Sequence, residues 1–339
     1  PRIEQARTLP SDVLDAMHAA QMFRMTTPKS VGGAELPPAL YAQVVATIAE
    51  GDASAAWCIG QSACAMMAAA YVEPHIAKEV FGDPRAVFTF GFTAGEPPCL
   101  AVPVKDGWII NGTWTFGSGN RLCAWLGGHC RLCDESGAPL KAPDGRFIER
   151  TMIFPRSAVI VDEEMWNVMG LCGTGSDTYS VKDLFVPTAY SVIPRVAARD
   201  QQLPAGTKKS PFNANQSLRD DGVIQARIAQ ADAKVNAASA WLVQLLHEAW
   251  DECVNTRSIS FDQRIKLREA CSHQIDASVE AVDMIFREAG ATAIFKKNPF
   301  ERRFRDMHVV AQQVQGSVAR MQSVGQHYLG LAPKLILIP

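Results

Sequence analysis

The chain lacks both an excess of charge of one sign and a long apolar segment. Its 33 lysine and arginine residues stand against 35 aspartate and glutamate residues, which gives a net charge of −2. Nucleic-acid binding needs clustered cations that replace counterions on the phosphates, so we expect no nucleic-acid partner. The longest nearly apolar stretch, Ala63 to Val72, has about half of the ~20 residues that a membrane-spanning helix needs. We therefore expect no membrane segment and no leader, and a cytoplasmic location.

Familiar ligand motifs are also missing. The nine cysteines are spread from Cys58 to Cys271 without the dense spacing of a secreted disulfide scaffold, which favours a reducing compartment. Cys130 and Cys133 have the spacing of half a zinc site, but no second pair completes it, so we expect no metal. The glycine-rich segment 170–175 is flanked by strand-like sequence and opens no helix, so it fits neither the Rossmann nor the P-loop fingerprint.

Helical patterns occupy the first part of the chain, and strand patterns follow them. A chain of 339 residues with 47% hydrophobic content is long enough for two or three packed units. In residues 1–85 we expect three helices: one capped by Ser11, a second opened by Pro37 and a third capped by Ser54. In residues 86–193, Val, Ile, Thr, Phe and Trp become frequent and turn signals recur at short intervals, which predicts a run of hairpins.

The remaining part of the chain is again helical in pattern. Apolar residues recur every three or four positions from Ile224 to Ala249, as on one buried helix face. Ser260 and Gln263 form a capping box for a second long helix, and Asn298 starts a third that is expected to reach Tyr328. Such helices predict an antiparallel bundle whose outer faces pair with other subunits, and the whole chain is predicted to be an α+β protein.

One expected hairpin carries a pattern suited to a flat ligand. Its turn is predicted at Asn111-Gly112. Because side chains alternate along a strand, Trp114, Phe116 and Ser118 should project from one face of it. An aromatic ring and a hydroxyl group two residues later can then contact one planar ring. The alternative is that both aromatic residues belong to the sheet core and that Ser118 begins a loop.

Two segments, 107–119 and 169–187, carry a family resemblance when they are read between the two helical regions. They resemble the flavin-cradling β-domain of the acyl-CoA dehydrogenase superfamily, and within it the oxygenase components of two-component flavin monooxygenases. The resemblance implies an N-terminal helical domain at residues 1–85, a middle antiparallel β-domain at 86–193 and a C-terminal helical bundle at 194–339. It also implies assembly as a homo-tetramer.

The same resemblance implies residues that hold the flavin. Phe116 and Ser118 match the aromatic and hydroxyl residues that lie against the flavin ring, with Ser118 facing its N5 atom. Thr174 and Ser176 of the second segment supply hydroxyl groups near the ring or the substrate. Turn hydroxyls also commonly bond their own backbone, and that alternative stays open for this pair.

Two further positions of the family pattern are altered in this sequence. Cys172 stands where arginine is usual in the glycine-rich turn. Lys209 and Phe212 resemble an Arg-x-x-Phe-Gly element that contacts the cofactor phosphates of a neighbouring subunit, with lysine as the cation. A solvated basic loop is the alternative for that segment.

The third helix of the bundle determines the reaction class. Arg305-Asp306 resembles the pair that opens the last catalytic stretch of the family, after which many dehydrogenases place a glutamate that removes the α-proton of an acyl-CoA. No Asp or Glu occurs from Met307 to Pro339, and the nearest equivalent is the amide of Gln315. This absence disfavours dehydrogenation with a base at this site.

In the monooxygenase branch the same stretch reads Arg-Asp-x-His, with a second histidine five residues later. This chain has His308 at the first position and Gln313 at the second, so we take His308 as the candidate base and Gln313 as a hydrogen-bonding residue. We expect His308, Gln312 or Gln313 to border a pocket with Ser118, on a helix that otherwise buries Phe304, Ala311, Val314, Val318 and Met321. The alternative for His308 is a structural histidine at a subunit contact.

The implied function is the oxygenase component of a two-component monooxygenase. A separate flavin reductase would supply reduced FMN or FAD, and O2 would form a C4a-hydroperoxyflavin that hydroxylates a small aromatic or heteroaromatic molecule. The alternatives are an acyl-CoA dehydrogenase-like flavoprotein with its base elsewhere, and a non-catalytic member of the fold. Between Pro194 and Lys208 the family has room for one more helix, which is either lost or omitted from this sequence.

Overall fold

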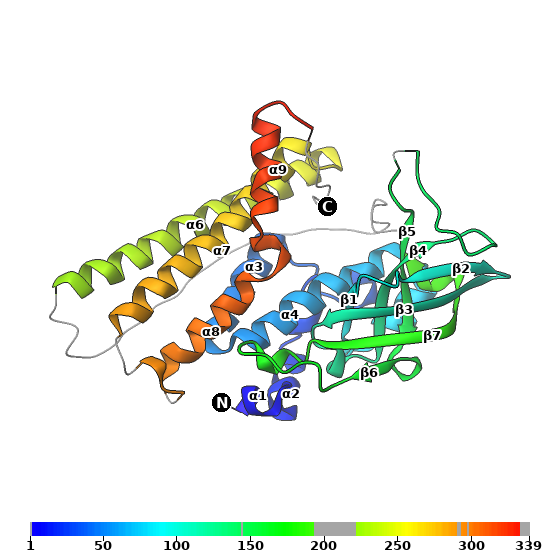
Figure 1. Cartoon of the computed structure of the whole chain (residues 1–339), viewed down its shortest axis with the longest axis horizontal. Helices are drawn as coiled ribbons and strands as arrows, with labels where there is room; N and C mark the ends of the chain where they lie inside the picture. Colours follow the sequence, from blue (N-terminus) through cyan, green and yellow to red (C-terminus); the bar gives the residue numbers. More distant parts are fainter. Residues whose placement is uncertain (1, 144, 193–221, 290–292, 297, 333–339) are drawn as a thin grey trace. The chain divides into compact units, whose positions relative to one another are not determined.

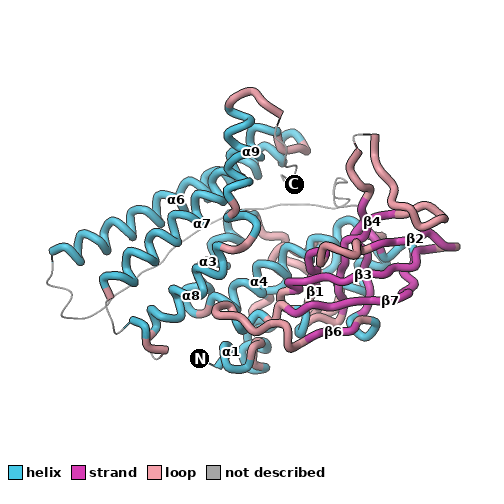
Figure 2. The backbone as a smooth tube through the Cα atoms, viewed as in Figure 1, coloured by secondary structure: helices cyan, strands magenta, loops and turns pink. Residues whose placement is uncertain are grey.

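The computed structural model describes residues 2–143, 145–192, 222–289, 293–296 and 298–332. Along the chain, helices come first, strands follow and helices return (Figure 2). The chain divides into two compact units. The first comprises Pro1–Leu36, Val44–Val168 and Cys172–Ala205, and the second comprises Pro37–Gln43, Met169–Leu171 and Gly206–Pro339. Within the described ranges, no helix is both long and apolar enough to cross a membrane.

The N-terminal helices begin close to the expected residues, with two differences in capping. Ser11 is the first residue of its helix rather than its cap, because the N-cap residue is Pro10, which makes no side-chain cap bond. The described elements are α1 (Arg2–Ala6), α2 (Ser11–Ala19), α3 (Pro38–Gly51), α4 (Ala53–Met66) and α5 (Pro74–Phe81). The predicted cap at Ser54 is wrong, because Asp52 caps α4 by accepting a hydrogen bond from the Ala55 amide at 2.9 Å. Ser54 is instead fully buried within the first turn of α4.

The strands of the first unit form one sheet. They are β1 (Phe88–Thr93), β2 (Leu100–Val104), β3 (Gly107–Gly117), β4 (Trp125–Leu132), β5 (Glu149–Pro155), β6 (Ile160–Asp162), β7 (Asp177–Pro187) and β8 (Ser191–Val192). The order is β6-β7-β3-β1-β4-β5-β8, with β2 paired to β3 and β4. Most pairs are antiparallel, as expected for the β-domain, but β4 runs parallel to both β1 and β2. Helix α4 packs beside β1 (Figure 1).

A cluster of aromatic residues forms the centre of this sheet. Trp114 and Tyr179 are fully buried and stack at 5.6 Å between ring centroids, and Phe154 lies 5.5 Å from Trp114. The Tyr179 hydroxyl accepts from the Gly91 amide at 2.7 Å and donates to the Gly127 carbonyl at 2.5 Å. Since β3 and β7 meet at this cluster, their ends are held in a fixed register.

Strand β3 corrects two expectations. Asn111 and Gly112 lie inside β3, and the hairpin turn is formed at Asp106, whose φ is 63°. Gly112 is needed for close packing, because a Cβ atom there would lie 2.8 Å from the Cys99 Sγ. The expected common face for Trp114 and Phe116 is also wrong. A register shift follows Trp114, and Phe116 has a φ of 57°, so Trp114 is buried whereas Phe116 is 59% exposed.

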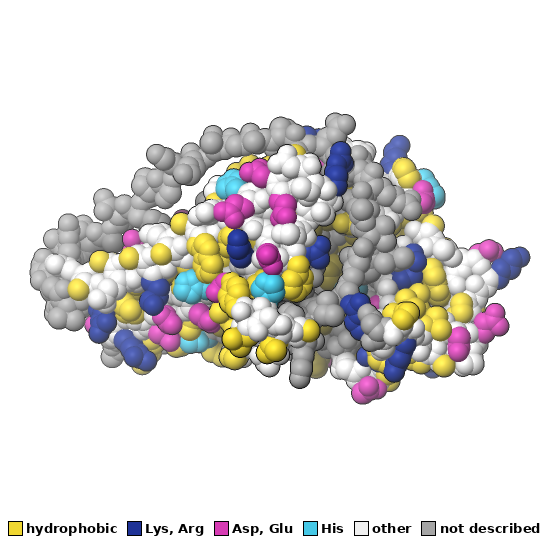
Figure 3. Space-filling view, turned by 90° about the horizontal axis from the view of Figure 1, so that it is seen from above, with side chains coloured by type: hydrophobic (Ala, Val, Ile, Leu, Met, Phe, Trp, Pro, Cys, Tyr) yellow, Lys and Arg dark blue, Asp and Glu magenta, His cyan; other side chains and the backbone are white. Residues whose placement is uncertain are grey.

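The second unit is built on two long helices that run side by side (Figure 1). Helix α6 (Gly222–Thr256) packs against α7 (Phe261–Glu288), and the two helices bury small residues such as Ala238, Ala270 and Ala277. The Ser260 side chain caps α7 by accepting from the Gln263 amide at 3.3 Å, but the Gln263 side chain bonds the Leu245 carbonyl instead of completing a capping box. In the face that Figure 3 presents, apolar and charged side chains of both signs are interspersed.

The predicted third helix is divided into two. Asn298 caps α8 (Pro299–Ala311) as expected, but a 3-10 turn at Val314–Gly316 separates it from α9 (Val318–Tyr328). The Gln313 Oε1 accepts from the Gln315 amide at 2.6 Å, which stabilises that turn. The predicted burial of Val318 is wrong, because its side chain is 84% exposed after the break. The side chain of Val314 lies outside the described part of the structure.

Candidate functional site

Four polar side chains from three segments meet in the first unit. The Trp57 Nε1 atom of α4 donates to the Ser118 Oγ at 3.0 Å, and the Ser118 Oγ lies 2.8 Å from the Ser176 Oγ. The Ser176 Oγ in turn lies 2.7 Å from the Thr174 Oγ1. The three hydroxyl residues are 5%, 4% and 2% exposed in that order. We call Ser118, Ser176 and Thr174, with the Trp57 indole N–H, the hydroxyl chain.

The hydroxyl chain includes three residues that the sequence singled out and one that it missed. Ser118 follows β3, Thr174 ends a 3-10 turn (η6, Cys172–Thr174), and Ser176 precedes β7. Thr174 and Ser176 bond each other, so the alternative of purely backbone-directed hydroxyls does not describe this pair. Trp57 carries no local signal, since an alanine-rich helix gives no reason to expect its indole nitrogen to reach a strand end.

Close backbone packing brings the two turns together. The Gly119 amide donates to the Thr174 carbonyl at 2.8 Å, and the Asn120 Nδ2 bonds the Gly117 and Gly175 carbonyls at 2.8 and 2.7 Å. Gly119 and Gly175 have φ values of 77° and 48°, which favour glycine. Together these bonds hold Ser118 and Ser176 at hydrogen-bond distance.

Helix α4 supports the same turns from one side. A Cβ atom on Gly173 would lie 2.1 Å from the Ile3 Cγ2 of α1 and 3.1 Å from the Ser54 Cβ of α4, so a larger residue does not fit there. One turn further along α4, the Cys58 Sγ lies 3.8 Å from the Thr174 carbonyl oxygen. Burial raises the pKa of Cys58 to about 12, so it stays a neutral thiol at physiological pH.

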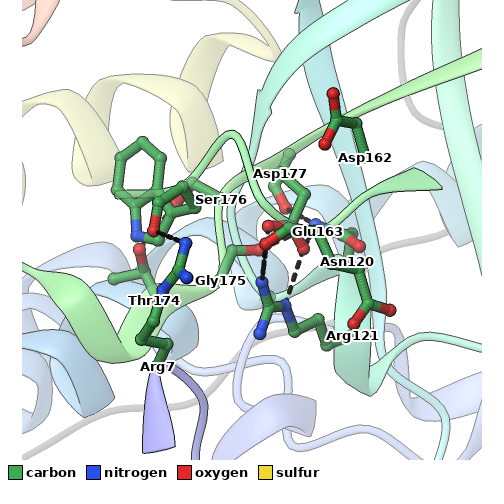
Figure 4. A network of polar contacts seen from close by, with 12 residues as sticks. Arg7, Asn120, Arg121, Asp162, Glu163, Thr174, Gly175, Ser176 and Asp177 are labelled. Carbon is green, nitrogen blue, oxygen red and sulfur yellow. Dashed lines mark hydrogen bonds and ion pairs between the residues drawn. The ribbon is translucent and has the colours of Figure 1, made fainter. Parts of the chain in front are cut away.

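A buried ion pair fixes the start of β7 (Figure 4). Asp177 is fully buried and accepts from the Arg121 Nε and Nη2 atoms, each at 2.7 Å. This hydrogen bond raises the pKa of Arg121. The Arg121 Nη2 also bonds the Glu163 carbonyl at 2.9 Å, and Arg7 bonds the Glu164 carbonyl at 3.3 Å and the Trp166 carbonyl. No local pattern indicates this network, because its members are far apart along the chain.

An exposed aromatic ring lies next to the buried hydroxyl chain. Phe116 is 59% exposed, and its ring meets the edge of Trp166 with centroids 6.2 Å apart. The Ser118 amide donates to the Phe116 carbonyl at 2.8 Å, so the ring and the hydroxyl belong to one tight turn. An apolar ring beside a buried hydroxyl with bonding capacity left over fits a planar heteroaromatic ligand such as a flavin ring.

The candidate base lies in the second unit and has an unexpected partner. The His308 Nε2 of α8 lies 2.8 Å from the Asp283 Oδ1 of α7. The His308 ring also lies 4.3 Å from that of Phe304, which stacks on Phe286 at 4.1 Å. A carboxylate at Nε2 makes this nitrogen the donor and leaves Nδ1 as the acceptor of a neutral imidazole. Asp283 lies 25 residues before His308 and carried no motif.

The Arg305-Asp306 pair has a structural role in the second unit. Arg305 donates to the Met169 carbonyl and forms a bidentate ion pair with Glu301. The Asp306 Oδ1 accepts from the Leu171 amide at 2.8 Å. Gly170 lies against this stretch, since a Cβ atom there would be 2.8 Å from the Arg305 carbonyl carbon. The pair thus anchors residues 169–171 to α8.

The remaining predicted residues are placed as follows. Gln312 is exposed, and Gln313 is half-buried and bonded to the 3-10 turn. Cys172, where the family has arginine, donates through its Sγ to the Val168 carbonyl at 3.2 Å. Lys209 and Phe212 lie outside the described residues. Ser118 belongs to the first unit and His308 to the second, and their common pocket stays a prediction.

The half zinc motif is part of the sheet. Cys130 and Cys133 are buried, and burial raises the pKa of both thiols. The neighbouring His129 Nδ1 bonds the Thr151 Oγ1 at 2.7 Å. The part of the chain that the structure describes contains no group of three or more His, Cys, Asp or Glu side chains placed to hold a metal ion.

Comparisons with known proteins agree with this architecture. Two family models match, the acyl-CoA dehydrogenase N-terminal domain over residues 1–79 and the acyl-CoA dehydrogenase C-terminal domain over residues 195–317. The chain is 24% identical over 355 residues to the indole-3-acetate monooxygenase of Acinetobacter baumannii, with 95% of this chain and 88% of the relative covered. It is 25% identical over 374 residues to a flavin-dependent monooxygenase, oxygenase subunit, of Mycobacterium tuberculosis, with 97% and 91% covered.

A solved structure shares the same fold over nearly the whole chain. XiaF from a Streptomyces species, in complex with FADH2 and glycerol, superposes with a TM-score of 0.86 at 20% identity and covers 98% of this chain and 92% of its own. The chain therefore belongs to the acyl-CoA dehydrogenase superfamily, and within it resembles the oxygenase components of two-component flavin-dependent monooxygenases.

Proposed function

We propose that this protein is the oxygenase component of a two-component flavin-dependent monooxygenase. It binds a reduced flavin delivered by a separate reductase and uses O2 to hydroxylate a small aromatic or heteroaromatic molecule. The observation that carries the proposal is the hydroxyl chain that ends at Ser118 beside the exposed ring of Phe116. The names of the relatives support the reaction class, since they describe a monooxygenase of an indole compound and an oxygenase subunit.

The residues of the first unit suit a flavin ring. Phe116 offers an apolar surface, and Ser118 offers a buried hydroxyl for the ring edge at N5. Phe116, Ser118, Thr174 and Ser176 are the flavin-contacting residues in this proposal, with the phosphates held by the segment that contains Lys209 and Phe212. When bound, a reduced flavin supplies the activation of O2 that aromatic hydroxylation requires.

The protein's own residues position the flavin, exclude water and provide a base. Because the hydroxyl chain is buried, bulk water is kept away from the N5 edge, and less of the activated oxygen is released as hydrogen peroxide before it reaches the substrate. His308, with Asp283 at its Nε2, offers Nδ1 to take the proton of a phenolic or indolic substrate. Gln313 can orient the substrate through its amide, but it cannot act as a base.

The proposal also covers the oligomeric state, the flavin, the domain limits and the location. We propose a homo-tetramer, with α6 and α7 as the surfaces that pair, because Ile228, Val254 and Phe261 leave apolar side chains exposed along them. The flavin is FMN or FAD. We also propose the domain limits expected from the sequence, at residues 1–85, 86–193 and 194–339, and a cytoplasmic location.

The test is oxygen transfer by the purified protein. Reduced FMN and reduced FAD are titrated anaerobically, and the complex is then mixed with 18O2 and a panel of phenols and indoles in the presence of a generic flavin reductase. We expect tighter binding of reduced than of oxidised flavin and a product that carries one 18O atom. A protein that binds neither reduced FMN nor reduced FAD, or a product without the 18O label, would contradict the proposal. A reaction without the protein controls for free peroxide.

A non-catalytic role is the second candidate, favoured by Gln313 and Cys172, which both depart from the family pattern. The same experiment separates the two. A scaffold protein gives no labelled product on any substrate, whereas an oxygenase component hydroxylates at least one member of the panel.

A further inference from the structure

The Ser118 hydroxyl group is restricted in how it can bond. A serine hydroxyl has one hydrogen to donate and two lone pairs that accept. The Trp57 indole N–H can only donate, so its 3.0 Å bond permanently occupies one lone pair of the Ser118 Oγ. One hydrogen and one lone pair remain, and these are divided between Ser176, 2.8 Å away, and any ligand at Ser118.

The hydrogen bonds of the hydroxyl chain can therefore run in either of two directions. In the first, Ser118 donates to Ser176 and Ser176 donates to Thr174, which leaves a lone pair of Ser118 to accept from a ligand. In the second, Thr174 donates to Ser176 and Ser176 donates to Ser118, so the Ser118 hydrogen is available to a ligand. The Oγ to Oγ distances of 2.8 Å and the Oγ to Oγ1 distance of 2.7 Å suit either direction.

The two directions match the two redox states of a flavin. The N5 atom carries a hydrogen in the reduced flavin and is a bare acceptor in the oxidised one. We propose that the hydroxyl chain reverses its direction between these states, and that Ser176, by accepting the Ser118 hydrogen, lets Ser118 accept from the N5–H group of reduced flavin. Ser176 is thus a positioning residue that favours the reduced form, whereas Trp57 occupies the same lone pair in both states. This inference rests on the proposed function and assigns a residue to its preference for reduced flavin.

The reduced state depends more strongly on Ser176. Without the Ser176 hydroxyl, an N5–H donor leaves the buried hydrogen of Ser118 with no acceptor, whereas an oxidised flavin leaves only one lone pair of Ser118 unfilled. A buried donor without a partner is costly, and an underused acceptor is tolerated better. Removal of the Ser176 hydroxyl should therefore weaken binding of the reduced flavin selectively.

The experiment measures dissociation constants of FMN and FAD in both redox states, under anaerobic conditions with dithionite as reductant. We expect Ser176→Ala to weaken binding of the reduced flavin about tenfold and binding of the oxidised flavin less than about threefold. Ser176→Thr keeps the hydroxyl and should retain wild-type selectivity. Ser180→Ala is the matched control, because Ser180 lies on the neighbouring strand β7 but is not part of the hydroxyl chain. It should change neither dissociation constant.

A second variant covers a failure of Ser176→Ala to fold. Ser176→Cys keeps a side chain of similar size, but its sulfur accepts hydrogen bonds only weakly, so the preference for reduced flavin should fall several-fold. Trp57→Phe is its control, because the Trp57 bond to Ser118 is the same in both redox states and its loss should leave the preference unchanged. Equal weakening of both flavin states, or none, in a folded Ser176→Ala or Ser176→Cys variant would overturn the inference. A wild-type protein that binds no reduced flavin would instead overturn the proposed function.

Discussion

At the residue scale, a carboxylate on α7 determines which nitrogen of His308 can act. The Asp283 Oδ1 lies 2.8 Å from the His308 Nε2, an arrangement that orients the imidazole and fixes its tautomer. The same helix carries a second carboxylate with a histidine partner, Asp262, whose Oδ1 lies 3.0 Å from the His327 Nε2. The two pairs have similar geometry, and only the first includes a predicted catalytic residue.

We expect Asp283→Asn to lower hydroxylation turnover about 10- to 100-fold, because an amide no longer holds the productive tautomer. Binding of reduced flavin should not change. Asp262→Asn is the control and should leave turnover within about twofold. Nitrogen-15 NMR of His308 in both proteins reports the tautomer directly. Equal turnover in the two variants would remove His308 and Asp283 from the proposed mechanism.

A second residue links protonation to the stability of the sheet. Burial lowers the pKa of His129, which bonds Thr151 and lies edge-on to Phe90 at 4.9 Å. The unfolded chain then binds more protons than the folded one below the ordinary histidine pKa of about 6.5. The free energy of unfolding should therefore fall as the pH is lowered from about 6.5 towards the folded-state pKa.

Urea unfolding between pH 7 and pH 5 checks this dependence. His129→Gln should have a smaller loss of stability on acidification than the wild type, because the neutral amide binds no proton. Burial also lowers the pKa of His18, so His18→Gln should remove a separate part of the same dependence. Parallel curves for the wild type and His129→Gln would show that His129 does not contribute.

At the element scale, the ion pair of Arg121 and Asp177 joins the 3-10 turn that follows β3 (Asn120–Leu122) to the start of β7. Both contacts are 2.7 Å, and Asp177 is fully buried one residue after Ser176. Loss of one partner leaves a buried charge, which destabilises far more than loss of an exposed pair. The chain provides a matched exposed pair in Arg85 and Asp15, also 2.7 Å apart but with side chains 56% and 61% exposed.

We expect Arg121→Ala to lower the free energy of unfolding by about 3 to 5 kcal/mol and Arg85→Ala by about 1 kcal/mol or less. Chemical denaturation at pH 7 measures both. A folded Arg121→Ala variant should also bind reduced flavin more weakly, because the turns that carry Ser118 and Ser176 lose their common anchor. Similar losses of stability in the two variants would show that the Asp177 charge is not stabilised mainly by Arg121.

At the scale of the whole molecule, the family resemblance implies two chemistries on one fold, and residues 307–339 of this chain offer no carboxylate where many dehydrogenases place their base. No acidic residue follows Asp306, and the Asp306 carboxylate is engaged by the Leu171 amide. An acyl-CoA dehydrogenase needs a carboxylate to remove the α-proton of the thioester. The fold is therefore available without the base that the dehydrogenases place at this site.

We expect no α,β-dehydrogenation of acyl-CoA thioesters by this protein. The check is incubation with short- to long-chain acyl-CoAs and an artificial electron acceptor, with enoyl-CoA formation followed by absorbance. A dehydrogenase of the same fold serves as the positive control. Turnover at ~1 s⁻¹ or more on any of the thioesters would support the dehydrogenase alternative.

The sequence by itself determined the order of the elements. Apolar periodicity and caps such as Ser260 and Asn298 act over a few residues, so they predicted the helices of the second unit. The family resemblance pointed to Ser118, Thr174 and Ser176, which the structure brings into hydrogen-bond contact. Their contact with a flavin stays a proposal.

Only the tertiary structure decided what surrounds these residues. The register shift after Trp114 turned Phe116 outward, and the 3-10 turn after Ala311 divided the last helix. Trp57 reaches Ser118 across 61 residues of sequence, and Arg121 reaches Asp177 across 56. The physical reason is that a bulge or a buried ion pair gains its free energy from packing between distant segments. Local sequence patterns carry no record of that packing.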